Sequence, residues 1–191
     1  MANIDDARGF QPRYMLNGDP IRVLPRTFIV KDSVAVRKFN PVQLTDQGTT
    51  TRALEATAAS DQLIGIAVNN VSTTDTDRTL RVYPVSPSTV FAVQLADAGT
   101  TFASQHIGSQ ADFDTVSGTT KVTPYGGTEA YGTTELLATF NQDTTKANCL
   151  IIGLDTDPSW DPDNTFGDHA KVLVTFNQGL LSGNTNPIDA V

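Results

Sequence analysis

The sequence predicts an all-β protein, an antiparallel β-sandwich or barrel with an extended N-terminal arm and long polar loops. Three apolar runs of strand length follow one another at residues 63–68, 79–85 and 90–95. In the third run, large apolar residues alternate with Ala and Gln, which is the two-residue period of a strand with one buried face. We interpret the three runs as consecutive strands of one antiparallel sheet and as the core of the fold.

The first part of the body predicts further strands at residues 27–30 and 34–39, separated by a turn at 31–33. Residues 45–51 are polar and are expected to form a loop. Residues 53–61 are the best candidate for a helix in this half, but they lack a clear cap, and a strand or a turn is equally acceptable there.

Two prolines, Pro84 and Pro87, remove backbone donors after the second core run. They predict a sheet edge, a bulge or a crossing between sheets at this point. Glycines then divide the chain at the short spacing that is typical of sandwiches and barrels. Later runs of strand length lie at residues 121–125, 134–140, 148–154 and 170–177.

The N-terminal residues are extended in this interpretation. Prolines at positions 12, 20 and 25 exclude a long helix, and no alternating run survives between them. The chain therefore divides into an N-terminal arm at 1–27, a β body at 28–178 and a flexible C-terminal tail at 179–191. Whether the body is one barrel or two small stacked ones stays open at this stage.

The bulk composition excludes several classes of protein. The chain has 191 residues, of which 18% are charged, and no apolar stretch approaches the roughly 18–20 residues of a membrane-spanning helix. The N-terminus lacks the apolar segment of a secretory signal. Cys149 is the only cysteine, which excludes an internal disulfide framework and a multi-cysteine zinc site. We expect synthesis in a reducing cytoplasm and no contact with a membrane.

Charge is unevenly distributed along the chain. The formal net charge is −8, yet the first 40 residues hold seven basic against four acidic side chains, so they carry +3 and the remainder carries −11. A basic leading segment favours contact with an acidic partner. The acidic body is not expected to bind nucleic acid, because phosphate contacts need clustered Lys and Arg.

The acidic segment 155–168 is the one candidate for a metal site. Its five aspartates could converge on Ca²⁺, which takes six to eight oxygen ligands. The spacing does not match an EF-hand, and Asp is also an ordinary turn residue, so calcium binding is left open and no cofactor is expected. The aspartates are Asp155, Asp157, Asp161, Asp163 and Asp168.

No nucleophile elbow, zinc-protease motif or phosphate-binding loop is present, so we expect no enzymatic activity. His106 and His169 are the only histidines and are expected to be surface or packing residues. Trp160 either pins its loop to the body or stacks on a sugar ring. The second possibility gives an alternative function, a carbohydrate-binding or adhesive β-module of a virion or cell surface.

Two short motifs stand near the N-terminus, Arg8-Gly9-Phe10-Gln11-Pro12 and Leu16-Asn17-Gly18-Asp19-Pro20. With the segments 62–67 and 81–95, they make the chain similar to the capsid decoration (cement) proteins of tailed bacteriophages. The resemblance implies a virion structural protein without enzymatic activity. Such a protein sits on the outer capsid surface, commonly as a homotrimer, and clamps adjacent subunits of the major capsid protein.

The resemblance also implies which residues meet the capsid. The arm would supply charged contacts through its arginines and apolar anchors through its aromatic and aliphatic residues. A charge at Phe10 would then detach the protein from the shell without unfolding its body. The expected contact residues are Arg8, Phe10, Pro12, Arg13, Tyr14, Leu16, Arg22 and Arg26.

Overall fold

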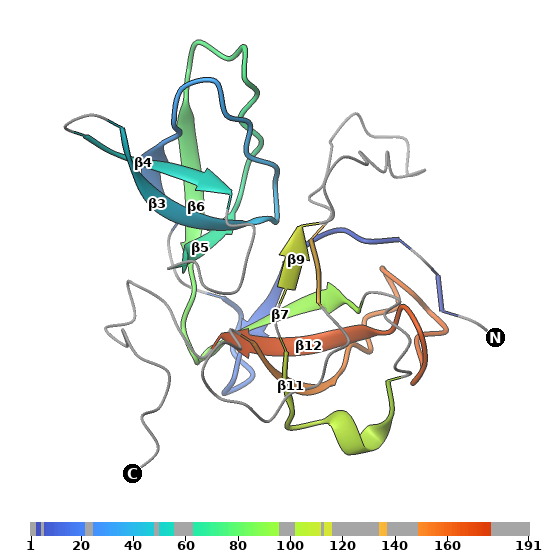
Figure 1. Ribbon diagram of the computed structural model, residues 1–191. Coiled ribbons are helices and arrows are strands. Elements are labelled where there is room, and N and C mark those ends of the chain that lie inside the picture. Colours follow the sequence, from blue (N-terminus) through green and yellow to red (C-terminus); the bar gives the residue numbers. More distant parts are fainter. Residues whose placement is uncertain are drawn as a thin grey trace.

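The computed structural model is all-β, as the sequence predicts, and consists of two five-stranded antiparallel sheets and a short two-stranded one (Figure 1). It describes residues 3–4, 6–21, 25–47, 50–55, 63–95, 102–111, 113–115, 134–136 and 149–176. The expected strand at 121–125 and the expected tail at 179–191 lie outside these residues. Within them, no helix has the length or the apolar character needed to cross a membrane.

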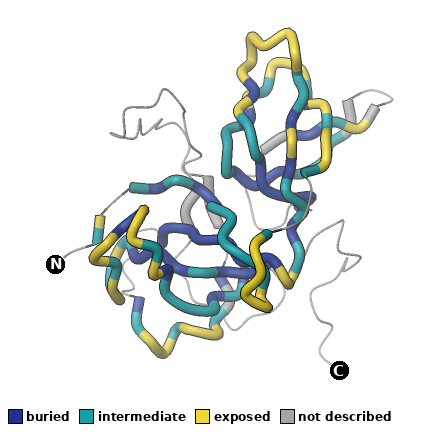
Figure 2. Tube along the Cα trace, turned by 180° about the vertical axis from the view of Figure 1, so that it is seen from behind, coloured by how far each residue is buried: buried dark blue, intermediate teal, exposed yellow. Residues whose placement is uncertain are grey.

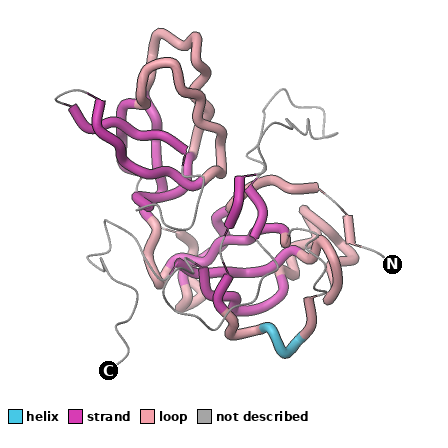
Figure 3. Tube along the Cα trace, in the orientation of Figure 1, coloured by secondary structure: helices cyan, strands magenta, loops and turns pink. Residues whose placement is uncertain are grey.

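Sheet A has the strand order β1-β7-β12-β11-β8 and contains segments from both ends of the chain. Its strands are β1 (Gln11–Met15), β7 (Thr89–Gln94), β12 (Lys171–Phe176), β11 (Cys149–Leu154) and β8 (Gln110–Ala111). A short 3-10 helix, Ser104–His106, precedes β8. Long loops, including residues 155–170 between β11 and β12, surround this sheet (Figure 3).

Sheet B has the order β2-β6-β5-β3-β4. Its strands are β2 (Arg26–Ile29), β6 (Thr79–Pro84), β5 (Leu63–Ala67), β3 (Pro41–Gln47) and β4 (Thr50–Glu55). The sheet curls into a half-barrel, because Val30, just after β2, forms an isolated parallel bridge with Ala53 of β4. The two-stranded sheet pairs β9 (Phe113–Thr115) with β10 (Thr134–Leu136).

The prediction that three consecutive runs share one sheet is wrong. β5 and β6 pair antiparallel in sheet B, whereas β7 lies in sheet A between β1 and β12. The chain changes sheets between β6 and β7, where Pro84 and Pro87 stand. This confirms the predicted crossing, because prolines cannot donate to a continuing ladder.

Two local predictions in sheet B are wrong. Residues 34–39 do not form a strand; they make only isolated bridges, including that of Val36 with Val71. Residues 45–51 belong largely to the β3–β4 hairpin instead of a loop, since β-branched Thr suits a strand as well as a turn. Residues 53–55 continue β4, which is the strand alternative left open for 53–61, and the rest of that segment lies outside the described residues.

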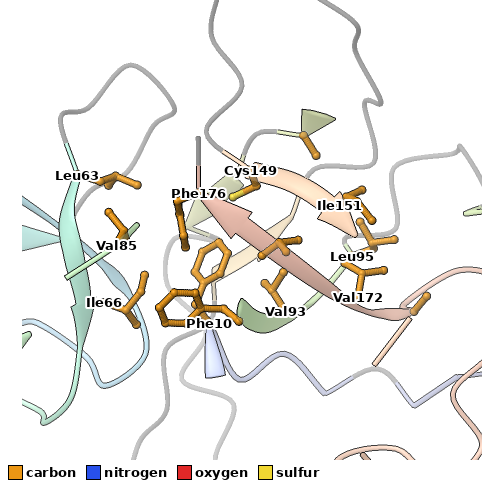
Figure 4. Packing of buried hydrophobic residues seen from close by; sticks show 14 of the residues in the cluster. Phe10, Leu63, Ile66, Val85, Val93, Leu95, Cys149, Ile151, Val172 and Phe176 are labelled. Carbon is orange, nitrogen blue, oxygen red and sulfur yellow. The ribbon is translucent and has the colours of Figure 1, made fainter. Parts of the chain in front are cut away.

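Two apolar clusters hold the fold together (Figure 2). The larger cluster is centred on the core face of sheet A, where Phe10, Phe91 and Phe176 meet. Leu63, Ile66 and Val85 reach the same cluster from the sheet B side, as the close-up shows (Figure 4). The smaller cluster fills the half-barrel with aliphatic side chains from β5 and β6 and from the segments around them. The two halves of the molecule therefore share apolar contacts.

Candidate functional site

The N-terminal residues expected to form an exposed arm are largely built into sheet A. Gln11–Met15 form the edge strand β1, which pairs with β7. No alternating pattern indicates this strand, because Pro12 interrupts it and the register shifts between Pro12 and Tyr14. Both Pro12 and Tyr14 are half-buried. The expectation of a strand-free arm over these residues is thus corrected.

Phe10 is a core residue. Its side chain is 0% exposed, and its ring centroid lies 5.0 Å from that of Phe176. Gly9 permits this insertion, because its φ is +69° and a Cβ there would stand 2.6 Å from the Phe39 carbonyl oxygen. The Phe10 amide donates to the same oxygen at 2.8 Å. The expectation that a charge at Phe10 would only detach the protein is therefore wrong, since it would enter the apolar cluster.

Residues 3, 4 and 6–8, which we call the strap, lie against residues 155–170, which we call the acidic loop. Asn3 is bound at both ends of its amide: Nδ2 donates to the Thr165 and Asp168 carbonyls at 3.0 and 2.8 Å, and Oδ1 accepts from the Thr165 amide at 2.9 Å. The Ile4 amide donates to Asp161 Oδ2 at 2.9 Å. These contacts join segments that are more than 150 residues apart in the sequence.

Two polar side chains of sheet A form the floor under the strap. Lys171 and Gln94 stand opposite each other on β12 and β7, and both are 0% exposed. Gln94 Oε1 accepts from the Asp6 amide at 2.8 Å, and Lys171 Nζ donates to the Ile4 carbonyl. Lys171 Nζ also lies 3.5 Å from Asp161 Oδ2 and donates to the His169 carbonyl at 3.0 Å. A buried ammonium is tolerated only with such partners.

Arg8 and Arg13, two of the expected capsid contacts, are instead paired within the chain. Arg8 forms a salt bridge to Asp6 with Nη2 and Oδ2 2.6 Å apart. Arg13 binds Asp155 Oδ2 through Nε and Nη2, and its Nη1 lies 3.1 Å from Asp157 Oδ2. Both guanidinium groups are bound to carboxylates of the chain, and the side chains of Arg8 and Arg13 are only 14% and 13% exposed.

Trp160 pins the acidic loop to the strap. It is 4% exposed, and its indole Nε1 donates to the Asp6 carbonyl at 3.0 Å. The guanidinium carbons of Arg8 and Arg13 lie 5.8 and 5.9 Å from its ring centroid, within the range of cation–π contacts. A sugar could not stack on this ring without displacing them. The pinning interpretation of Trp160 is confirmed.

Three of the five carboxylates of the acidic loop, those of Asp155, Asp157 and Asp161, accept hydrogen bonds from protein donors. Asp155 is paired with Arg13, and Asp161 Oδ1 accepts from the Asp163 amide at 3.2 Å. Among the described residues, which include the whole loop, no three His, Cys, Asp or Glu side chains are placed to hold a metal ion. The amide of Ser159 donates to Asp157, and this hydrogen bond, followed by that from the Ser159 hydroxyl, holds the pKa of Asp157 below its ordinary value.

The remaining candidates are dispersed. His106 Nδ1 accepts from the Ala103 amide at 3.1 Å, and His169 takes a left-handed backbone conformation with φ +56° at the end of the acidic loop. Cys149 is 0% exposed within the larger apolar cluster, as expected for a small core residue. Leu16 and Arg26 are exposed, whereas Arg22 lies outside the described residues.

Three polar residues hold the strap and the acidic loop in place and were not singled out from the sequence: Asn164, Gln94 and Lys171. Asn164 Nδ2 donates to the Asp155 and Lys171 carbonyls at 2.8 and 2.7 Å, and its Oδ1 accepts from the Lys171 amide at 2.9 Å. A signal was present in the strands: Gln94 and Lys171 are polar residues inside runs that are otherwise apolar. Such residues indicate a second buried face with hydrogen-bonding partners.

No protein-family model, curated protein or solved structure matches the chain. What bears on function is therefore the geometry of the strap, the exposed residues beside it and the resemblance of the N-terminal motifs.

Proposed function

We propose that the chain is a virion structural protein that binds the outside of an icosahedral phage capsid and clamps adjacent subunits of the major capsid protein. It acts without enzymatic activity or cofactor, does not bind nucleic acid and is located on the outer capsid surface. The active form is a homotrimer. In such an assembly the second and third contacts form at high effective concentration, so modest individual contacts sum to stable attachment.

The observation that best supports this proposal is the structural use of the two resembling motifs. Gly9 and Phe10 of the first motif fix the entry of the chain into sheet A, and the second motif forms a turn at the end of β1. In that turn the Gly18 amide donates to the Met15 carbonyl at 2.7 Å, and the Asp19 amide donates to Asn17 Oδ1 at 3.1 Å. Both motifs thus determine the local backbone conformation. Proteins that share this fold would be expected to keep such motifs.

The turn at 16–20 is the part of the N-terminal segment best placed to meet a partner. All five of its residues are exposed, and Leu16 is 53% exposed. The backbone behind it is fixed, because the Met15 amide donates to the Asp19 carbonyl and the Leu16 amide to the Ser88 carbonyl, both at 2.8 Å. An exposed aliphatic residue on a rigid turn loses little entropy on binding, which favours it as an anchor.

The test uses shells assembled from the major capsid protein of the phage to which the proposal assigns this chain. Purified protein is added to the shells, and the bound fraction is measured by co-sedimentation. Leu16→Asp should weaken binding by about tenfold or more, as expected for loss of an interface anchor. The matched control is Ile107→Asp, because Ile107 is also aliphatic and is 42% exposed elsewhere in the molecule. Unchanged binding by Leu16→Asp, or failure of the wild-type protein to sediment with the shells, would overturn the proposal.

A further inference from the structure

The edge of sheet B at β2 has backbone groups that no described residue pairs. The Val30 amide donates to the Arg78 carbonyl at 2.9 Å, and the Val68 amide donates to the Arg81 carbonyl at 2.8 Å. In an antiparallel pair of strands, residues whose backbone groups bond to the partner strand alternate with residues whose backbone groups point away from it. Since Val30 bonds to the β6 side and Arg81 bonds to the β5 side, the N–H and C=O groups of Thr27 and Ile29 point away from β6.

The other side of β2 is closed only beyond its end. There the Lys31 amide donates to the Ala53 carbonyl at 2.9 Å, and Val30 and Ala53 form an isolated parallel bridge. Over the described residues the β2–β4 pairing goes no further, so the half-barrel is open along β2. Thr27 is exposed at this opening, and Ile29 is 42% exposed.

The edge of sheet A at β1 is protected in ways that β2 is not. Pro12 has no amide hydrogen to offer, and the strand bulges between Pro12 and Tyr14. The outward groups of Met15 are occupied by its own turn, since its amide binds Asp19 and its carbonyl binds Gly18. Proteins use such devices to prevent pairing with other chains. A regular edge without proline or bulge is therefore a surface that is available for pairing.

The charges around the β2 edge are mainly basic. Arg26 is exposed at the start of β2, and Arg81 is exposed on β6 opposite Thr27. Neither guanidinium contacts a carboxylate among the described residues. Lys31 follows the strand, and Asp77 stands at the far end, where its carboxylate accepts from the Thr79 amide at 2.9 Å. Pairing with the same edge of a second copy would bring like charges together, whereas a segment with Asp or Glu would meet complementary charge.

We propose that β2 is a docking strand for an extended acidic segment of another protein, which adds to sheet B as a further strand. Backbone hydrogen bonds to Thr27 and Ile29 give the affinity, and Arg26 and Arg81 select the acidic side chains. The proposal stands on the β2 edge alone. If the capsid proposal also holds, the segment belongs to the major capsid protein, and the β2 edge and the 16–20 turn are two parts of one contact surface.

The test uses a short blocked peptide of alternating Val and Glu, with a Val–Lys peptide of the same length as the charge control. Binding is followed by amide chemical shifts and hydrogen exchange in the intact protein. The Val–Glu peptide should shift and protect the amides of Thr27 and Ile29. The Val–Lys peptide should bind at least about tenfold more weakly, because charge complementarity selects between partners.

Two variants separate backbone pairing from charge. Thr27→Pro removes an outward amide that the β2–β6 ladder does not use, so it should abolish binding while leaving the protein folded; Thr27→Val keeps the amide and should bind normally. Arg81→Glu should reverse the preference, so that the Val–Lys peptide binds more tightly. This variant tests the proposal if Thr27→Pro fails to fold. Absence of protection at Thr27 and Ile29, or equal binding by Thr27→Pro, would overturn the proposal. A dimer in light scattering that Thr27→Pro abolishes would do the same, because the occupant would be a second copy.

Discussion

Sheet A and sheet B differ in what covers them. Every residue of β7 is buried, because one face of sheet A meets the larger apolar cluster and the other lies under the strap and the acidic loop. Sheet B has one aliphatic cluster, and three of the four residues of its edge strand β2 are exposed. Basic and acidic side chains are thus used internally in sheet A, whereas sheet B keeps basic side chains on its surface.

Because of this difference, the surface that can meet a partner is not the one expected from the N-terminal motifs. The segment from Arg8 to Leu16 contains most of the residues that the resemblance implies as contacts, but Arg8, Phe10 and Arg13 are paired or buried there. Among the described N-terminal residues, those that remain exposed are Ile4, the turn at 16–20 and most of β2. A contact surface should therefore be sought where the chain leaves sheet A and enters sheet B.

The largest expected effect comes from breaking the aromatic packing of sheet A. Phe10→Ala should lower the free energy of unfolding by about 4 kcal/mol, because a buried aromatic side chain is lost and a cavity remains. Ile29→Ala, at the exposed edge of sheet B, should change it by no more than about 0.5 kcal/mol. Urea denaturation followed by circular dichroism measures both. Equal small losses in the two variants would show that Phe10 does not anchor the larger apolar cluster.

The second-largest expected effect comes from the buried polar side chains of sheet A under the strap, which have no counterpart among the described residues of sheet B. Lys171→Met should cost about 3 kcal/mol, because it leaves Asp161 buried without its cation and the Ile4 carbonyl without its donor. The matched control is Lys31→Met in the sheet B half, where the lysine is only half-buried and little change is expected. Hydrogen exchange should also accelerate at the amides of Ile4 and Asp6 in Lys171→Met alone.

A second substitution checks the cause. Asp161→Asn in the Lys171→Met background removes the unpaired carboxylate and should recover part of the lost stability. Additive losses in the double variant would contradict a coupled pair, since groups in contact are expected to couple.

Patterns that depend on local spacing could be predicted from the sequence. The all-β class, β11 and β12 follow from short apolar runs, and the crossing after β6 follows from Pro84 and Pro87. Trp160 as a pin follows from its position in a loop rich in Pro and Asp. In each case the residues that decide the outcome are neighbours in the chain.

Contacts between distant segments could not be predicted in the same way. The pairing of β7 with β1 and β12 depends on both ends of the chain, so an alternating run next to β6 gave no sign that it had changed sheets. Arg13 looked like a free cation because its partner Asp155 lies 142 residues away in the sequence. Charge counted along the sequence cannot distinguish a cation that meets a partner from one that is already paired.

The smallest expected effect concerns two glycines, Gly9 in the first N-terminal motif and Gly18 in the second. Both have left-handed backbone, with φ +69° at Gly9 and +84° at Gly18. A Cβ at Gly9 would stand 2.6 Å from the Phe39 carbonyl oxygen, whereas a Cβ at Gly18 meets nothing within 4 Å. Gly9→Ala should therefore cost about 2 kcal/mol and Gly18→Ala about 1 kcal/mol, since both add backbone strain but only the first adds a clash. Thermal unfolding of the two variants side by side measures the difference. Equal losses would mean that the backbone at Gly9 can move away from Phe39 without loss of stability. Sheet A would then not depend on this close approach.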